Sequence, residues 1–237
     1  MNALGGVVLW TLMALVVLSG FGSGEAVAQQ STGAGQSAGK LPSDVFPDSY
    51  ARIPPAKRED MTTEEERQAF DRLVAVDAAP QSGPLGPTGT RLHFPIVADY
   101  YRSAVRWMRE KTGIEPKYVE LAILVATRET NGKYEWLAHE ENAIKAGIAR
   151  STVEIVRNKQ EPKGLDPREE VIIRFGREMH HEPKVTSKTF ADAEKLFGRK
   201  KTLALTMIMA HYSGSGLLLH SYDLQLGPNQ KDPFPAH

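Results

Sequence analysis

Signals that begin and end helices recur along this chain roughly every 15–20 residues, and this spacing limits the fold more than any other feature. Apolar residues between the signals repeat with helical periodicity, and no stretch shows the sustained alternation that is typical of a half-buried strand. These observations predict an all-α bundle of about seven to nine helices. The clearest expected helices cover 94–111, 118–130, 134–146, 151–157, 168–180 and 186–197.

Three details of the pattern predict local structure. Thr62 or Thr63 can cap a first helix, because acidic residues follow in its first turn. The segment 78–89 holds three Pro and three Gly and is expected to be a loop. The stretch 203–226 is strongly apolar, and its Ser-Gly-Ser-Gly run at 213–216 predicts a kink or a division into two helices.

The first 28 residues are typical of a secretory signal peptide. Their apolar run at 7–18 is too short to span a hydrocarbon core of about 30 Å, and Ala26-Val27-Ala28 forms a small-x-small cleavage site. No Lys or Arg precedes the run, so an uncleaved anchor helix is the alternative. We expect a secreted or periplasmic protein with a flexible linker at 29–40, a folded domain at 41–237, and no stable membrane insertion after signal removal.

Two features of the composition exclude whole classes of chemistry. The chain has no cysteine, which rules out disulfides, thiolate nucleophiles and Cys-ligated zinc or iron–sulfur sites. Its 29 basic and 29 acidic residues balance, so the overall charge does not favour nucleic acid as a partner. We expect no metal and no other cofactor, because the chain has no dense ligand spacing such as His-Glu-x-x-His.

The segment 120–147 carries the residues best suited to chemistry. On a helix, Glu135 and His139 are i, i+4 neighbours, so the carboxylate could fix the imidazole tautomer and raise its basicity. A carboxylate beside an imidazole is a pair suited to general acid–base catalysis. The alternative is an exposed ion pair beside a Trp136 that packs in the core.

Three runs in this segment carry a family resemblance. They resemble the signature of the carboxymuconolactone decarboxylase / alkylhydroperoxidase-like family. The runs are ELAIL at 120–124, YEWLAH at 134–139 and Ala146-Gly147. The resemblance extends over about residues 50–225. It implies an alkylhydroperoxidase-like helical bundle that assembles as a homo-oligomer, either a trimer or a hexamer.

The thiol-peroxidase branch of that family uses a Glu, a Cys-x-x-Cys pair and a His. By this resemblance the Glu is Glu120 and the His is His139, whereas the two Cys positions fall on Gly132 and Glu135. Thiolate attack on a peroxide cannot occur without a thiol. The remaining set of Glu120, Glu135 and His139 resembles the decarboxylase branch, which moves protons to and from a lactone-type substrate.

Five further residues are candidates for substrate binding. Arg128 could hold a substrate carboxylate, and a surface arginine is the alternative. His211 and Tyr212 could line the same pocket from a later helix, or form a hydrogen-bonded pair in the core. Tyr134 and Trp136 belong to the motif itself and flank Glu135.

The two halves of the domain also show a weak internal similarity. When His139 is placed on His220, each half reads as an apolar helix, a break of small residues and a helix that carries a His. This arrangement predicts two pseudo-repeated helical units within one domain.

Together these features predict an exported, cofactor-free lyase or isomerase that acts on a small carboxylated or lactone substrate. His139 would be the general acid or base, Glu135 would orient it, and Glu120 would be a second proton carrier. One alternative is a non-catalytic small-molecule binding or scaffold protein, because ring-cleavage catabolism is usually cytoplasmic. A further alternative is an antioxidant protein that works without redox thiols.

Overall fold

The computed structural model describes residues 41–77 and 86–235. The expected signal peptide at 1–28 and the expected linker at 29–40 lie outside these residues. The described residues form nine α-helices and one short 3-10 helix, and an isolated bridge between Phe46 and Ala51 is their one β-type contact. The expected all-α bundle is therefore confirmed.

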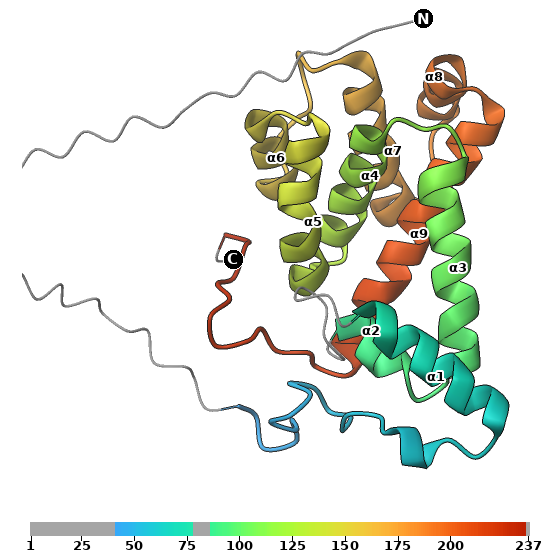
Figure 1. The fold of residues 1–237 in the computed structure, drawn as a ribbon. Helices are drawn as coiled ribbons and strands as arrows, with labels where there is room; N and C mark the ends of the chain where they lie inside the picture. The colour runs from blue at the N-terminus through green and yellow to red at the C-terminus, as the bar shows by residue number, and fades with distance from the viewer. Residues whose placement is uncertain (1–40, 78–85, 236–237) are drawn as a thin grey trace, which may run out of the picture. The chain divides into compact units, whose positions relative to one another are not determined.

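The helices follow one another with short connections (Figure 1). Their bounds are α1 (Glu64–Asp77), α2 (Gly86–Arg91), α3 (Pro95–Lys111), α4 (Pro116–Glu129), α5 (Lys133–Ala146), α6 (Arg150–Arg157), α7 (Pro167–His181), α8 (Ser187–Phe197) and α9 (Arg199–Ser221). The 3-10 helix (Arg58–Asp60) precedes α1.

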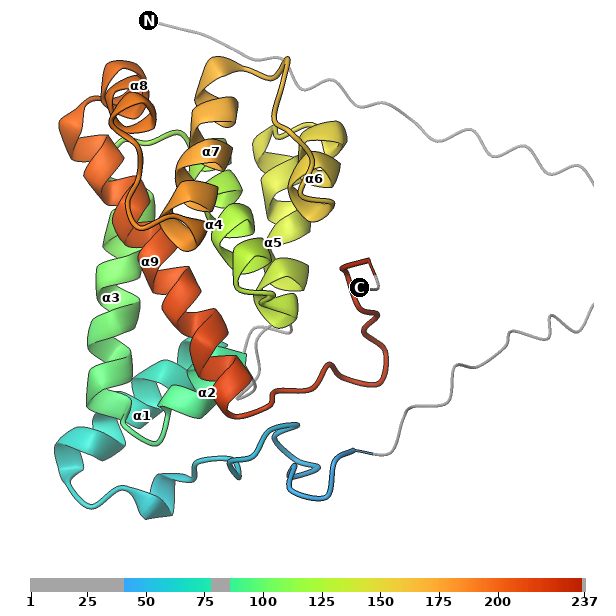
Figure 2. The same ribbon diagram turned by 180° about the vertical axis from the view of Figure 1, so that it is seen from behind.

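Helix α4 is the centre of the core. Pro116 starts it, as proline favours the first helical turn, and every residue from 118 to 128 is buried. A helix that is buried on all faces belongs to the interior of a domain. Helices α5, α7 and α9 pack around it, as both views show (Figures 1 and 2).

A second, smaller core lies where α1 packs against α3. Its buried side chains are Met61, Phe70, Leu73, Leu92 and Ala98. Helix α2 contacts both α3 and α9, so it joins this smaller core to the rest of the bundle. This position brings Arg91, the last residue of α2, into contact with Ser215 of α9, the longest of the described helices.

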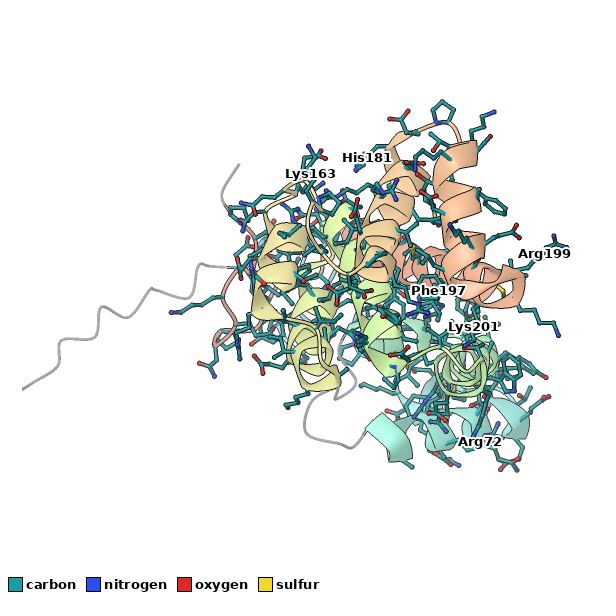
Figure 3. The ribbon with its side chains drawn as sticks, turned by 90° about the horizontal axis from the view of Figure 1, so that it is seen from above. Arg72, Lys163, His181, Phe197, Arg199 and Lys201 are labelled. Atoms are coloured by element: carbon teal, nitrogen blue, oxygen red, sulfur yellow. The ribbon has the colours of Figure 1, made fainter. Side chains whose placement is uncertain are left out.

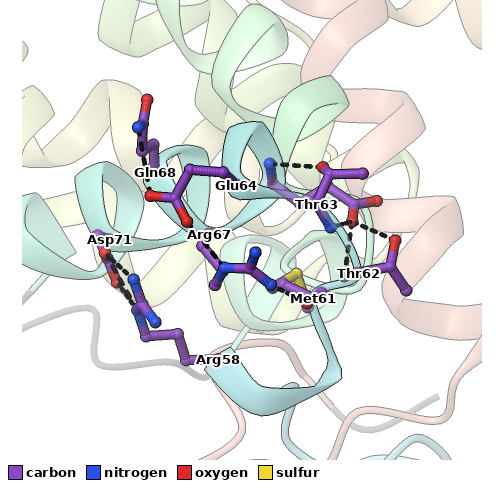
Figure 4. A network of polar contacts seen from close by, with 9 residues as sticks. Arg58, Met61, Thr62, Thr63, Glu64, Arg67, Gln68 and Asp71 are labelled. Atoms are coloured by element: carbon purple, nitrogen blue, oxygen red, sulfur yellow. Dashed lines mark hydrogen bonds and ion pairs between the residues drawn. The ribbon is translucent and has the colours of Figure 1, made fainter.

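The N-terminus of α1 is capped as its sequence predicts (Figure 4). The Glu66 carboxylate accepts hydrogen bonds from the backbone amides of Thr62 (2.8 Å) and Thr63 (3.0 Å). In return, the Thr63 hydroxyl oxygen accepts a hydrogen bond from the Glu66 amide at 3.1 Å. This reciprocal capping box satisfies amides that the first turn of a helix leaves without partners.

Helix α9 runs without interruption through the Ser-Gly-Ser-Gly segment, so the expected division into two helices is wrong. Gly216 is needed there for close approach, because a Cβ at this position would lie 2.5 Å from the Thr130 hydroxyl oxygen. The Ser213 hydroxyl donates to the Met209 carbonyl at 2.7 Å, within the helix. These small residues allow α9 to pack against the end of α4 instead of ending the helix.

The start of α9 is tied to the neighbouring helices (Figure 3). The Lys201 ammonium donates to the Gly113 carbonyl at 2.6 Å, between α3 and α4. Phe197, at the end of α8, packs edge-on against Tyr118 with the ring centres 5.4 Å apart. Among the described helices, α9 alone is long and apolar enough to cross a membrane, but half of its most apolar window is buried, as in a core helix.

Two more sequence expectations need correction. Residues 86–89 belong to α2 and not to a loop, since Gly86 has a φ of 73° and starts a short helix that packs on α9. Helix α6 begins at Arg150 after an Ala149 cap, one residue before the expected Ser151. The proposed internal repeat is not confirmed, because the first unit breaks between α4 and α5 whereas the second is the continuous α9.

Candidate functional site

A cavity of about 770 Å³ lies between α2, α3, α4, α5 and α9. The sequence did not settle whether its candidate residues share one space, and the fold brings most of them together. Six of the predicted site residues line this cavity: Glu120, Tyr134, Glu135, His139, His211 and Tyr212.

The centre of the cavity wall is a chain of three charged or polar side chains from three helices. Nδ1 of His139, on α5, lies 2.7 Å from Oε2 of Glu120, on α4. The other carboxylate oxygen of Glu120 accepts a hydrogen bond from Nη2 of Arg109, on α3, at 2.6 Å. Burial alone would raise the pKa of Glu120, but His139 and Arg109 together hold this pKa below its usual value.

This geometry corrects the role expected for Glu135. Glu120, and not Glu135, orients the imidazole, because the contact between α4 and α5 carries the Glu120 carboxylate directly onto Nδ1. Nε2 of His139 has no partner among the described residues and is the nitrogen left for a ligand. The imidazole also packs edge-on against Tyr212, with ring centres 5.1 Å apart and an angle of 87°.

Glu135 occupies a separate position in the same cavity. Its side chain is buried, and Oε2 has no hydrogen-bond partner among the described residues. Burial raises the pKa of Glu135 to about 7, although the charge of Arg91 and a contact with the Ser215 hydroxyl act in the opposite direction. A buried carboxyl group that titrates near neutral pH can both donate and accept a proton.

Arg91 was not predicted from the sequence. It ends α2, and its Nη2 donates to the Ser215 hydroxyl on α9 at 2.7 Å. Its guanidinium lies 5.7 Å from the centre of the Tyr101 ring, and it forms no ion pair within 4 Å among the described residues. Burial lowers the pKa of Arg91. A partly buried cation with a neutral hydrogen-bond partner favours the binding of an anion.

Arg109 was missed as well, and local sequence signals could not have identified either arginine. Arg91 falls next to a segment rich in Pro and Gly, and its partner Ser215 is 124 residues away. Arg109 reads as one of several charged residues on the polar face of α3. Only the packing of α2 and α3 onto α9 and α4 brings both guanidinium groups to the cavity.

Three predicted ligand-binding residues line the cavity around this centre. His211 lies between Tyr101 and Tyr212, with ring centres 5.9 Å and 5.3 Å away. Burial, reinforced by the charge of Arg91, lowers the pKa of His211 to about 4, so its imidazole is neutral at pH 7. Burial likewise raises the pKa of the Tyr212 hydroxyl. Tyr134 covers Gly86, where a Cβ would collide with its ring.

The other two predicted ligand-binding residues, Trp136 and Arg128, do not line this cavity. Trp136 is fully buried, donates from its indole nitrogen to Glu140 at 2.8 Å, and packs against Phe234 with ring centres 5.2 Å apart. Arg128 donates from Nε to the Arg157 carbonyl at 2.6 Å and lies 4.5 Å from the centre of the Phe234 ring. Both residues therefore anchor the C-terminal segment.

The other histidines in the described part of the chain do not line this cavity, and Nε2 of His93 lies 2.9 Å from the Pro54 carbonyl oxygen. Nε2 of His180 lies 2.7 Å from the Ser213 hydroxyl, and His181 pairs with Glu129 at 2.7 Å. His220 is exposed, and its Nε2 lies 3.3 Å from the Asn131 carbonyl. Within the part of the chain that the structure describes, no group of three or more His, Asp and Glu side chains is arranged to hold a metal ion.

Comparisons with protein-family models, with curated proteins and with solved structures find no match for this chain. The family resemblance therefore rests on the quoted sequence runs alone.

Proposed function

We propose that the chain is a cofactor-free acid–base enzyme, a lyase or an isomerase, that acts on a small carboxylated or lactone substrate. The observation that carries this proposal is the hydrogen bond between Glu120 and His139 at the wall of a cavity that also contains Arg91 and Arg109. A carboxylate that holds one imidazole nitrogen leaves the other free to exchange protons with a substrate. Two guanidinium groups match the negative charge of a carboxylate or an enolate.

The proposed reaction begins with His139. Nε2 removes a proton from the carbon next to the substrate carbonyl, and the electron pair of the broken C–H bond moves onto the carbonyl oxygen as an enolate. The protonated imidazole is stabilised by Glu120, whose negative charge lies 2.7 Å away. The guanidinium groups stabilise the enolate oxygen.

Protonated Glu135 then completes the reaction. In a substrate with a β,γ C=C bond the enolate is a dienolate, and Glu135 donates its proton to the γ carbon. The carbonyl C=O bond re-forms, the C=C bond moves to the α,β position, and a π electron pair of the dienolate forms the new C–H bond. The net result is an isomer, after which His139 passes its proton back to Glu135 through solvent. In a lyase reaction, loss of CO₂ supplies the electron pair in place of deprotonation, and the same carboxyl group protonates the carbon.

A homo-oligomer is also part of the proposal. Large apolar side chains on α3 and α9 are exposed in the single chain, among them Tyr100 (72%), Trp107 (61%) and Leu203 (60%). Exposed apolar side chains that cluster on a surface are typical of a protein interface. Light scattering coupled to gel filtration would give the mass of the particle, and a monomer at micromolar concentration would contradict this part.

The acid–base proposal can be tested without knowledge of the natural substrate. Carboxylates and lactones are incubated with the protein in D₂O, and exchange of carbon-bound hydrogen for deuterium is followed by NMR. We expect exchange with the wild type and none above background with His139→Ala. The matched control is His220→Ala, which removes an exposed imidazole on α9 and leaves exchange unchanged.

Three outcomes would contradict the proposal. A folded His139→Ala variant that still catalyses exchange would remove His139 from the mechanism. Binding of carboxylates without any exchange would favour the alternative of a non-catalytic binding protein. Consumption of a hydroperoxide by the purified protein would instead favour the antioxidant alternative.

A further inference from the structure

A second cavity of about 520 Å³ adjoins the first, between the α2–α3 region and α9. Its size lies in the range of about 300–1,000 Å³ that is typical of small-molecule sites. The lining is mainly apolar and aromatic. The residues found only in this cavity's lining include Ile53, Phe94, Val97, Ala210, Leu218 and Tyr222.

The two cavities meet at a shared wall. The residues that line both cavities are Arg91, Ala98, Tyr101 and His211. Arg91 is therefore a cation at the junction, and among the described residues its guanidinium donates a hydrogen bond only to the neutral Ser215 hydroxyl. An anion bound to Arg91 would contact the acid–base residues on one side and the apolar cavity on the other.

Gly214 also faces the second cavity. It lies inside α9, where glycine destabilises a helix relative to alanine. Packing explains the nearby Gly216, which touches Thr130, but a Cβ at Gly214 would meet nothing within 4 Å. Gly214 is exposed, so the absence of a side chain here leaves open space beside the second cavity.

We propose that the second cavity binds the hydrocarbon part of an amphiphilic carboxylate whose carboxylate group is held by Arg91. The preferred substrate is then an alkyl- or aryl-substituted acid, and not a compact acid that is polar throughout. This inference rests on the proposed function, because it specifies the hydrocarbon part of the substrate that the same site would bind. It concerns binding, however, and it can hold even where no turnover is observed.

The charges and shapes of the two cavities support this occupant over a second copy of the chain. The exposed apolar residues Phe94, Val97 and Tyr101 line the second cavity, whereas the equally exposed Leu203, Met207 and Leu217 do not. An interface that used the latter three would cover the neighbouring surface of α9. The cation at the junction, in contrast, is most easily explained by a ligand that carries its own negative charge.

The test measures binding by isothermal titration calorimetry with the straight-chain carboxylates from acetate to octanoate. For the wild type, each methylene buried in the cavity should tighten binding by about threefold to fourfold. In Gly214→Leu, the new side chain takes up part of the space beside the cavity, so the gain in affinity per methylene should be smaller than in the wild type. Leu217→Phe adds bulk to the same helix outside the cavity and should keep the wild-type dependence on length.

A third variant tests the role of Arg91 at the junction of the two cavities. Arg91→Gln should weaken the binding of all the acids by at least about tenfold, as expected for loss of a charged hydrogen bond, while the gain per methylene persists. Circular dichroism and thermal unfolding confirm that each variant is folded.

Three results would overturn the inference. The first is a wild-type affinity that does not change with the chain length of the acid. The second is a Gly214→Leu variant whose affinity rises with chain length as steeply as that of the wild type. The third is a wild-type oligomer that Gly214→Leu dissociates while carboxylate binding is unchanged, which would make the second cavity an interface between copies. None of these results depends on proton exchange, so they are separate from a failure of the acid–base proposal.

Discussion

Nδ1 of His139 lies 2.7 Å from a carboxylate oxygen of Glu120, although 19 residues and a helix boundary separate the two in the sequence. The turn between α4 and α5 makes this contact possible. Asn131 has a φ of 53°, and the Gly132 amide donates to the Thr127 carbonyl at 2.6 Å, which reverses the chain within a few residues. The two helices then run side by side, and the carboxylate of one reaches the imidazole of the other.

We predict that Glu120→Gln impairs proton transfer without unfolding the protein. The amide keeps the shape of the carboxylate but removes the charge that stabilises protonated His139. Positioned acid–base groups typically contribute about 10²–10⁴-fold to a rate, so deuterium exchange should slow by at least about 10²-fold. Glu65→Gln, on the exposed face of α1, is the matched control and should exchange at the wild-type rate. Unchanged exchange in folded Glu120→Gln would contradict the assigned role.

We predict that Glu135 makes stability depend on pH. Burial raises its pKa from 4.5 to about 7, so the folded state binds the proton more tightly than the unfolded state. The resulting stabilisation is complete below about pH 4.5 and is lost as the pH rises through about 7. Relative to Glu135→Gln, which stays neutral, the wild type should lose about 2 kcal/mol of unfolding free energy between about pH 5 and 8.

Urea unfolding at several pH values measures this difference. The two proteins are compared by how steeply their unfolding free energy changes with pH. A difference in stability that the amide of Glu135→Gln causes at every pH does not affect this comparison. Glu65→Gln should follow the wild-type slope. Parallel pH profiles for the wild type and Glu135→Gln would show that the pKa of Glu135 is not raised.

We predict opposite effects for two glycines that are two positions apart in α9. Gly214→Ala should stabilise the protein by about 0.5–1 kcal/mol, because the methyl group meets no neighbour and alanine favours the helix. Gly216→Ala should destabilise it by about 1–3 kcal/mol, because the methyl group would lie 2.5 Å from the Thr130 hydroxyl oxygen. Chemical unfolding of both variants gives the two values. Adding Thr130→Ser, which removes a methyl group but keeps the hydroxyl, should recover little of the loss in Gly216→Ala, whereas Thr130→Ala should recover more.

We predict that the C-terminal segment contributes to stability through Phe234. Its ring packs between Trp136 (5.2 Å) and the guanidinium of Arg128 (4.5 Å), and only 7% of it is exposed. Phe234→Ala should lower the unfolding free energy by about 3 kcal/mol and shift the fluorescence of Trp136 to longer wavelength. Lys231→Ala, in the same segment but exposed, should change neither quantity. A wild-type emission spectrum for Phe234→Ala would contradict this packing.

The fold was largely predictable because local signals agree with the packing. The Thr63–Glu66 capping box and Gly147, which has a φ of 110°, each mark a helix end that the structure confirms. The error at 213–216 has a clear physical cause. Glycine weakens a helix by only about 1 kcal/mol, and close packing against Thr130 outweighs that preference.

The site was predictable only in part. The motif at 120–139 identified Glu120, Glu135 and His139 as candidates, and the structure shows that all three line one cavity. Their roles could not be assigned in advance, because helical spacing pairs Glu135 with His139 whereas the contact between two helices pairs Glu120 with it. Arg91 has no sequence signal at all, since its function depends on a helix of six residues packing on α9.

The uninterrupted course of α9 has a consequence for how such a chain can change. Successive residues of a helix are about 100° apart, and this one helix presents His211 to the first cavity, Gly214 to the second and Ile208 to the core. Insertion or deletion of one residue near its middle would rotate the following residues by that angle and remove them from all three environments. We therefore expect the length of 199–221 to be far less variable than the identity of its exposed residues.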